Sequence, residues 1–497
     1  MTCGQRSWLG ALVAWWLCGC SPPPVQAPPA DAGHPLVAPI THGVAAEVTA
    51  TSAVVWARCD RETGLHVALR DRAGRETVAS TAVQAADDFT GRLKFEGLEA
   101  DSTYGYRAWC GPDSEGESDA ASGALRTAPD ARTARAVEFV WGGDLGGQHV
   151  CRDRAEGYPI LRTITARRPD FFIGLGDMIY ADDPCPATGR YGNWQTPGPP
   201  QPATDLPGFW AYWKYNREED ALRQLLAAVP YYAVWDDHEV LNDFGPRHDT
   251  VAAPAERSGV HLLPLGLKAF LDYNPIDAGT DRRLYRRVRW GRHLEVFFLD
   301  TRQYRDANFA PDDAMQPKTM LGAEQRRWLE RSLRASEATW KVIVSSVPLS
   351  IPTGSADHGR DGWANGDQPT GFEHELLAIL RFMAAHHINN SVWISTDIHF
   401  AAVFRDAPFP DQPAFRLYEI DTGPMNAGVF PKTDLDTTLN PERLFRYPES
   451  ADPALGFAQA KSWFNFGVLR IDATGALTIE IVNTYGNRLF ELALHPR

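Results

Sequence analysis

The sequence predicts an α/β domain preceded by a small β-sandwich. Short alternating apolar and polar runs fill the first part of the chain, whereas longer apolar strands alternate with helical patterns after Ala134. Nearly every one of the longer strands ends in an acidic residue or a histidine. At 497 residues the chain is too long for one compact core, so we expect two domains.

The N-terminal residues have the pattern of a targeting segment. Arg6 supplies a positive charge, and residues 8–17 form an apolar run that is too short to span a bilayer. The segment from Leu17 to Cys20 looks like a lipobox, which predicts export to the periplasm or the cell surface with a lipid anchor on Cys20. An ordinary cleaved signal peptide is the alternative. We assign residues 1–20 to the lipoprotein signal peptide and residues 21–40, which are rich in proline and alanine, to a flexible tether.

Four cysteines besides Cys20 remain after removal of the leader, an even number in an oxidising compartment. We favour Cys59 with Cys110 and Cys151 with Cys185, because each pair then falls inside one proposed domain. Unpaired buried thiols are the alternative.

Residues 41–128 are predicted to form the β-sandwich. The run from Ser52 to Arg58 is typical of its short strands, which are separated by glycine and aspartate turns. The segment from Leu98 to Arg107 resembles the late strand of a fibronectin type III-like domain, where a tyrosine corner follows a leucine turn. No catalytic cluster occurs in this part of the sequence, which indicates a structural or spacing module.

Residues 135–497 are predicted to form the α/β domain. Helical patterns cover residues 218–229 and 323–335. The segments 184–207 and 353–370 are predicted to be long loops, the first of them an ordered excursion or a lid beside the site. The buried strands are predicted at 137–141, 171–175, 231–235, 294–299, 342–347 and 392–395.

Four of these strands end in residues that point to metal chemistry. In an open α/β sheet the carboxyl ends of the strands form the ligand crevice. Acidic groups gathered there would repel one another strongly unless a multivalent cation lay among them. Each segment alone fits a turn, a helix cap or a core histidine, but together they predict a metal centre. The segments are Gly142-Gly143-Asp144, Gly176-Asp177 to Tyr180, Asp236-Asp237-His238-Glu239 and Asp397-Ile398-His399.

Composition and missing motifs exclude several classes of protein. The formal net charge of -14 argues against a sequence-specific nucleic-acid partner, which would need a broad basic surface. The chain has no Gly-x-Ser-x-Gly elbow of a serine hydrolase and no Cys-x-Pro-x-Arg motif of a sulfatase.

The order of the four segments resembles the calcineurin-like metallophosphoesterase superfamily and, within it, the alkaline phosphatase D (PhoD-like) family. The resemblance covers nearly the whole mature chain and includes the segment from Leu299 to Arg305 and a loop with Asp361 and Trp363. It implies a four-layer α/β/β/α metallophosphoesterase sandwich after the fibronectin III-like β-sandwich. The first segment departs from the superfamily, which commonly has Asp-x-His where this chain has Asp144 followed by Leu145 and Gly146.

The resemblance also implies two metal ions bridged by Asp177. Asp144, Tyr180 and His399 would complete the first site, where the phenolate favours Fe(III). Asp397 and either Asp237 or Asn242 would complete the second site, whose oxygen ligands suit Ca²⁺, with Mn²⁺, Mg²⁺ or Zn²⁺ as alternatives.

The implied activity is metal-dependent hydrolysis of phosphate mono- or diesters by a metal-activated hydroxide. His238 would bind a phosphoryl oxygen or protonate the leaving group. Arg302, together with Arg305, would clamp phosphate oxygens, although surface ion pairs are an equal alternative for both arginines.

The implied substrates are a small phosphoester, a phospholipid or a cell-wall phosphodiester. Four tryptophans near the predicted loops would contact the leaving group or only pack these loops. We expect a monomer that contacts the membrane through its lipid anchor alone. The rival interpretation is a non-enzymatic, surface-anchored binding lipoprotein with a metal-stabilised α/β domain. The tryptophans are Trp194, Trp210, Trp213 and Trp363.

Overall fold

The computed structural model describes residues 39–111, 120–246, 258–355 and 357–497. The predicted signal peptide, Cys20 and nearly all of the predicted tether lie outside the described residues. Among the described helices, none combines the length and the apolar character that crossing a membrane requires.

The first part of the described chain is a β-sandwich of two antiparallel sheets, with strand orders β1-β2-β5 and β4-β3-β6-β7. The tyrosine corner is confirmed, because the Tyr104 hydroxyl accepts a 2.8 Å hydrogen bond from the Glu99 amide. A disulfide between Cys59 on β2 and Cys110 on β6, the sandwich disulfide, joins the two sheets. The strands are β1 (Ile40–Val48), β2 (Ser52–Cys59), β3 (Thr63–Arg70), β4 (Glu76–Val83), β5 (Thr90–Glu96), β6 (Thr103–Cys110) and β7 (Ala121–Arg126).

Two larger sheets follow. The first has the order β10-β9-β8-β20-β21-β22, in which β8, β9 and β10 are parallel and the last three strands are antiparallel. Its strands are β8 (Val137–Gly142), β9 (Phe171–Leu175), β10 (Tyr231–Val234), β20 (Asn465–Ile471), β21 (Leu477–Asn483) and β22 (Arg488–Leu494). The second sheet has the order β11-β12-β13-β16-β18-β17-β19. Its strands are β11 (Arg286–Trp290), β12 (Leu294–Phe298), β13 (Trp340–Val344), β16 (Ser391–Ser395), β17 (Ala401–Asp406), β18 (Leu417–Asp421) and β19 (Pro441–Tyr447).

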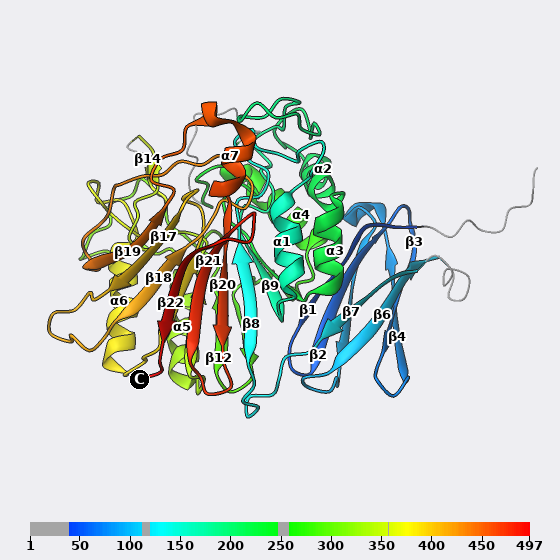
Figure 1. The fold of residues 1–497 in the computed structure, drawn as a ribbon, viewed down its shortest axis with the longest axis horizontal. Helices are drawn as coiled ribbons and strands as arrows, with labels where there is room; N and C mark the ends of the chain where they lie inside the picture. Colours follow the sequence, from blue (N-terminus) through cyan, green and yellow to red (C-terminus); the bar gives the residue numbers. More distant parts are fainter. Residues whose placement is uncertain (1–38, 112–119, 247–257, 356) are drawn as a thin grey trace, which may run out of the picture. The chain divides into compact units, whose positions relative to one another are not determined.

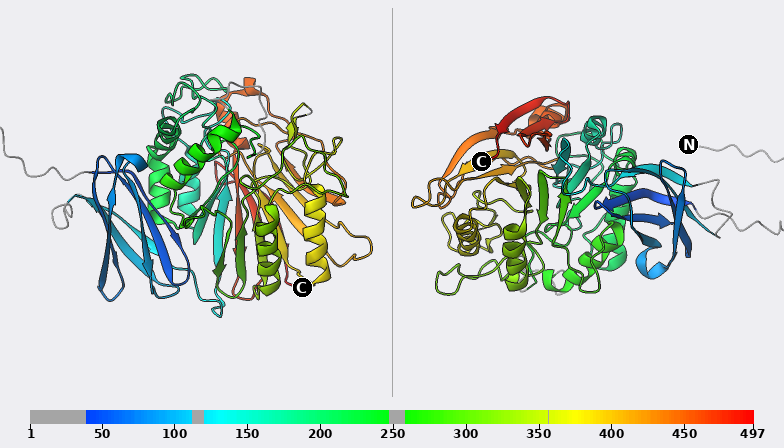
Figure 2. Two further views of the ribbon diagram at one scale, coloured as in Figure 1. Left: turned by 180° about the vertical axis from the view of Figure 1, so that it is seen from behind. Right: turned by 90° about the horizontal axis from the view of Figure 1, so that it is seen from below.

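The alternation of side chains along the strands produces four layers. Phe139 and Trp141 of β8 belong to the apolar core that also contains Val296 of β12, so the two sheets pack face to face. Val140, on the opposite face of β8, packs with Leu161 of α1. Figure 1 shows α1 and α3 beside β8 and β9, and Figure 2 shows α5 and α6 side by side.

The helices complete the outer layers. Those of the first sheet are α1 (Pro159–Arg167), α2 (Leu206–Arg217), α3 (Asp220–Ala228) and α4 (Gly259–Tyr273), and all four contribute to one core with β8 and β9. Apolar residues of α5 (Gly322–Ala335) and α6 (Glu373–Ala385) share another core with β12, β13 and β16. The remaining elements of the described chain are α7 (Gly456–Trp463), a small hairpin of β14 (Gly354–Ser355) and β15 (Gly359–Arg360), and the short 3-10 helices η1 (Ala85–Asp87) and η4 (Pro453–Leu455).

Sequence patterns located all six predicted strands, which are β8, β9, β10, β12, β13 and β16. The one shifted strand is β13, which ends at Val344. The Ser345 amide still donates to the Ile394 carbonyl of β16 at 3.1 Å, but the Ser345 hydroxyl donates to the Val347 carbonyl at 2.6 Å, where the chain bends. The two predicted helices correspond to α3 and α5. Helix α4 was not predicted, since an internal Pro264 interrupts its pattern.

Candidate metal centre

Loops after β8, β9, β10 and β16 bring acidic and imidazole side chains from four distant parts of the chain together. Ligand-type atoms of Asp144, Asp177 and His399 lie within 4.8 Å of one another. The same limit holds for a second group of Asp236, Asp237 and Asp397. Asp177 and Asp237 form a further group with His238, so the clusters share members and form one continuous site.

Oxygen atoms in this cluster lack hydrogen-bond partners although they are buried. Within the described residues, both carboxylate oxygens of Asp144 and one oxygen each of Asp177, Asp237 and Asp397 have no hydrogen-bond partner, although the Asp237 oxygen lies 3.5 Å from Arg302 Nη2. A buried carboxylate without a partner is costly, so such atoms usually face a cation or a bound water. The donor set of carboxylates, imidazole and phenol therefore fits a pair of hard metal ions.

The loops hold the candidate ligands in unusual backbone conformations. Asp144, Asp177 and Asp397 have φ angles of 57°, 51° and 74°, in the left-handed region that non-glycine residues seldom adopt. Gly423, with φ 113°, packs against Asp144 so closely that a Cβ atom would lie 2.3 Å from its Oδ2. Only glycine fits at this position, and it fixes the place of the Asp144 carboxylate.

His399 is oriented as a ligand through its other ring nitrogen. Nδ1 lies 2.6 Å from the Gly428 carbonyl, which requires Nδ1 to carry the proton. Nε2 then lies 3.2 Å from the Tyr180 hydroxyl and 3.8 Å from Asp144 Oδ1. Burial lowers the pKa of His399 to about 3, so the imidazole stays neutral.

The pKa of the carboxyl groups shifts in the opposite direction from that of His399. Burial raises the pKa of Asp144, Asp177 and Asp397 well above the usual range, and the charges of neighbouring carboxylates raise it further. Burial raises the pKa of Tyr180 as well. A multivalent cation would reverse this electrostatic cost, because it stabilises the ionised forms.

Glu239, the last residue of the Asp-Asp-His-Glu segment, supports the loops that carry the candidate ligands. Glu239 Oε2 accepts hydrogen bonds from the amides of Asp177 and Asp236 at 3.0 and 2.7 Å. The Met178 amide donates to Glu239 Oε1 at 2.8 Å. This carboxylate therefore fastens the loop after β9 to the loop after β10.

Comparison with protein families agrees with this geometry. The model of the PhoD-like phosphatase family matches residues 139–480, and that of the PhoD-like phosphatase N-terminal domain matches residues 26–129. The chain belongs to the PhoD-like phosphatase family.

Individual relatives of this PhoD-like chain agree with the family assignment. Alkaline phosphatase D of Bacillus subtilis (strain 168) is 27% identical over 271 residues, which cover 50% of this chain and 44% of the relative. This chain thus aligns with less than half the length of that curated relative. The solved structure of PhoD has a TM-score of 0.72 and 18% identity, over 92% of this chain and 94% of that one. A purple acid phosphatase, PPD1 from yellow lupin (Lupinus luteus) seeds, has a TM-score of 0.60 and 12% identity, over 92% of this chain and 74% of that one. These structures share the fold.

Sequence reasoning missed Asp182 in the PhoD-like site. Its Oδ1 lies 2.7 Å from His238 Nδ1, and its Oδ2 accepts from the Asn242 amide at 2.9 Å. The ring of His238 packs against that of Tyr180 at an interplanar angle of 31°, with centroids 4.2 Å apart. Burial lowers the pKa of His238, but Asp182 and the nearby carboxylates outweigh it and raise this pKa well above its usual value. The arrangement leaves Nε2 as the ring nitrogen available to the cleft.

Arg302 has no exposed side-chain surface. Its guanidinium donates to both oxygens of Asp361 at 2.8 and 2.7 Å and to Asp236 Oδ1 at 2.6 Å. Arg305, also fully buried, lies 2.5 Å from Asp361. This geometry favours ion pairs over a phosphate clamp for both arginines, but the pairs are buried and not on the surface as the alternative assumed.

A cleft of about 460 Å³ adjoins the cluster, and its lining includes His238, Asn242, Asp397 and His399. None of the four tryptophans that sequence reasoning considered as pocket walls belongs to this lining. Trp210, Trp213 and Trp363 are buried in the core, and Trp194 is 67% exposed beside Asp153.

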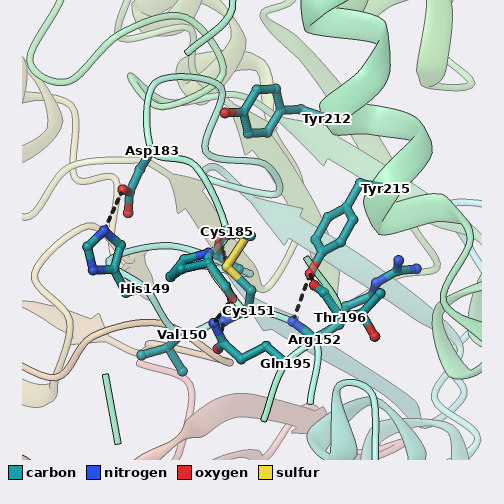
Figure 3. Close-up of a disulfide and its surroundings, with 12 residues drawn as sticks. His149, Val150, Cys151, Arg152, Asp183, Cys185, Gln195, Thr196, Tyr212 and Tyr215 are labelled. Atoms are coloured by element: carbon teal, nitrogen blue, oxygen red, sulfur yellow. Dashed lines mark hydrogen bonds and ion pairs between the residues drawn. A yellow bond between two sulfur atoms is a disulfide. The ribbon is translucent and has the colours of Figure 1, made fainter. Parts of the chain in front are cut away.

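The second predicted disulfide, between Cys151 and Cys185, is confirmed and is called the site disulfide here. It joins the segment that follows Asp144 to the segment that follows Tyr180 (Figure 3). The Cys151 amide donates to Gln195 Oε1 at 2.7 Å. This hydrogen bond ties the disulfide to the loop that contains Gln195. Two disulfides are typical of proteins that fold outside the cytoplasm.

Proposed function

We propose that this chain is a phosphoesterase that hydrolyses phosphate mono- or diesters at a two-metal centre. The observation that carries the proposal is the set of buried, unpartnered carboxylate oxygens beside the neutral imidazole of His399. In this proposal Asp144, Tyr180 and His399 would hold the first ion, and Asp177 would serve as a ligand for both. Asp397 and either Asp237 or Asn242 hold the second.

The chemistry of the donors supports Fe(III) at the first position and Ca²⁺ at the second, with Mn²⁺, Mg²⁺ or Zn²⁺ as alternatives. When bound, the two ions supply an activated water nucleophile and positive charge for the reacting phosphoryl group.

His238 delivers a proton from Nε2 to the leaving-group oxygen, or donates a hydrogen bond to a phosphoryl oxygen. Asp182 accepts from Nδ1–H, keeps the ring in place and stabilises the charged imidazolium. Arg302 acts on the reaction indirectly, because it holds Asp236 and Asp361 beside the ligands.

Export and a lipid anchor on Cys20 are part of the proposal. They are supported by the lipobox-like segment of the sequence and by the two disulfides. We also propose a monomer that acts on a small phosphoester, a phospholipid or a cell-wall phosphodiester. Mass spectrometry of the mature N-terminus and light scattering would check the anchor and the monomer.

The decisive experiment measures metal content and hydrolysis on the same purified sample. Inductively coupled plasma analysis should find two metal ions per chain, and the sample should hydrolyse p-nitrophenyl phosphate or its bis-ester. The Asp177→Asn variant should lose metal and activity together. Two bound ions without hydrolysis of any phosphoester would instead favour the binding lipoprotein.

A further inference from the structure

The cleft over the candidate metal centre has features that the proposed hydrolysis does not use. Its lining includes an aromatic residue, Phe430, a cationic residue, Lys432, and a hydroxyl-bearing residue, Thr353. These groups lie beside the candidate ligands Asp397 and His399, which line the same cleft. They are placed to contact a part of the substrate other than the reacting phosphoryl group.

Two cations, one in the cleft lining and one that contacts the lining residue Phe430, have no carboxylate partner within 4.0 Å among the residues that the structure describes. One is Lys432, and the other is Arg190, whose guanidinium carbon lies 4.7 Å from the centre of the Phe430 ring. Arg302 and Arg305 differ from them, since both are buried in ion pairs with Asp361. A chain with a formal net charge of -14 would repel an anionic substrate, so unpaired cations at the cleft matter for its capture.

The backbone around these cations is fixed relative to His399. The Phe430 amide donates to the His399 carbonyl at 3.3 Å, and the two rings lie 5.4 Å apart. The Lys432 carbonyl accepts a hydrogen bond from Arg446 Nη1 at 2.8 Å. The Arg190 amide donates to the His149 carbonyl, also at 2.8 Å. Both side chains therefore project from anchored positions rather than from free loops.

Thr353 gives an independent sign of a polar ligand. Its side chain is buried, with 5% of the residue exposed, and its hydroxyl finds no hydrogen-bond partner in the described part of the chain. A buried hydroxyl normally finds a partner, and a hydroxyl can donate to an oxyanion. Since Thr353 lines the same cleft as Lys432, a bound anion could satisfy it.

We propose that Lys432 and Arg190 form an anion subsite for a second negatively charged group of the substrate, with Phe430 and Thr353 as further contacts. The inference rests on the proposed function and narrows its substrate class. The preferred substrate then carries a second phosphate apart from the scissile one, as in a bisphosphate ester.

Binding measurements test the subsite without catalysis. Calorimetry on the metal-loaded protein compares propylphosphonate with propane-1,3-bisphosphonate, and metal content is measured after each titration. The wild type should bind the bisphosphonate more tightly. Exposed charge pairs contribute little each, so Lys432→Ala and Arg190→Ala should each reduce this preference about 1.5- to fivefold, with no change for propylphosphonate.

Two further variants serve as controls. Lys432→Arg keeps the charge and should keep the preference, whereas Arg334→Ala removes an exposed cation of α5, away from the cleft, and should leave it unchanged. Added salt should lower the preference of the wild type, because screening weakens exposed charges. Equal preferences in the wild type and both cleft variants would overturn the subsite.

Hydrolysis separates this inference from the proposed function. Initial rates on 1,3-propanediol monophosphate and bisphosphate should show a lower KM for the bisphosphate, lost in the double variant Lys432→Ala/Arg190→Ala. Hydrolysis of both esters with the same ratio in the wild type and the double variant would reject the subsite and leave the proposed function intact. If the wild type hydrolysed neither ester, the proposed function and the substrate preference that rests on it would both fail.

Discussion

Replacement of Arg302 by methionine should mainly lower the free energy of unfolding, because Arg302 acts in the structure and not on the reacting phosphoryl group. The guanidinium is fully buried and forms two hydrogen bonds to Asp361 and one to Asp236. In the variant Asp361 would keep Arg305, but Asp236 Oδ1 would keep only the Ser346 hydroxyl, 2.8 Å away. Removal of one partner from a buried ion pair typically costs about 3 to 5 kcal/mol, so we expect a loss of that size.

Urea unfolding in the presence of a chelator measures this loss free of metal linkage. The matched control is Arg326→Met, which breaks a partly exposed pair with Glu330 four residues along α5. Such a pair contributes about 0 to 1 kcal/mol, so the control should unfold close to the wild type. A methionine variant at position 302 that unfolds like the wild type and binds metal, but has no turnover, would refute this reasoning and restore the phosphate clamp.

Four other outcomes follow from the site. Asp182→Asn should lower kcat on alkyl phosphates about ten- to a hundredfold and change p-nitrophenyl phosphate turnover little, and equal losses would remove the general-acid role of the imidazole that Asp182 orients. Gly423→Ala should displace the Asp144 carboxylate and lower the metal content by one ion, which elemental analysis would detect. Serine at both Cys151 and Cys185 should cost about 3 to 4 kcal/mol in urea unfolding, given a loop of 34 residues, and should weaken metal retention. Serine at both cysteines of the sandwich disulfide should lower stability but leave metal retention unchanged. If the double variants of both disulfides retained metal, a positioning role for the site disulfide would be contradicted. Acidification should release the ions together with activity, since protons compete for carboxylates whose pKa is raised, and activity that persists after metal release would exclude metal catalysis.

The convergence of Asp144, Asp177, Asp397 and His399 was predictable from sequence for a physical reason. Parallel strands place their carboxyl ends at one edge of a sheet, so acidic residues after several apolar runs must gather there. The prediction of two sheets required the family resemblance, because each strand pattern by itself fits a single sheet as well.

Contacts between distant loops could not be predicted in the same way. Asp182 follows Tyr180 closely, but only the turn between them brings its carboxylate to His238. Arg302 at a strand end fits either a phosphate clamp or an ion pair, and burial, which a single sequence does not reveal, decides between them. Phe430 and Lys432 lie in a long irregular segment that has no periodic pattern, so sequence reasoning gave no sign of their place at the cleft.

The candidate ligands come from both large sheets, since Asp144 and Asp177 follow strands of one and Asp397 and His399 follow a strand of the other. Neither sheet alone can complete either ion position. Ion uptake should therefore be among the last events of folding, and a chain whose sheets have not yet docked would reach the quality-control machinery of its compartment empty. Bound metal would then distinguish a fully folded molecule from one whose two sheets have not docked.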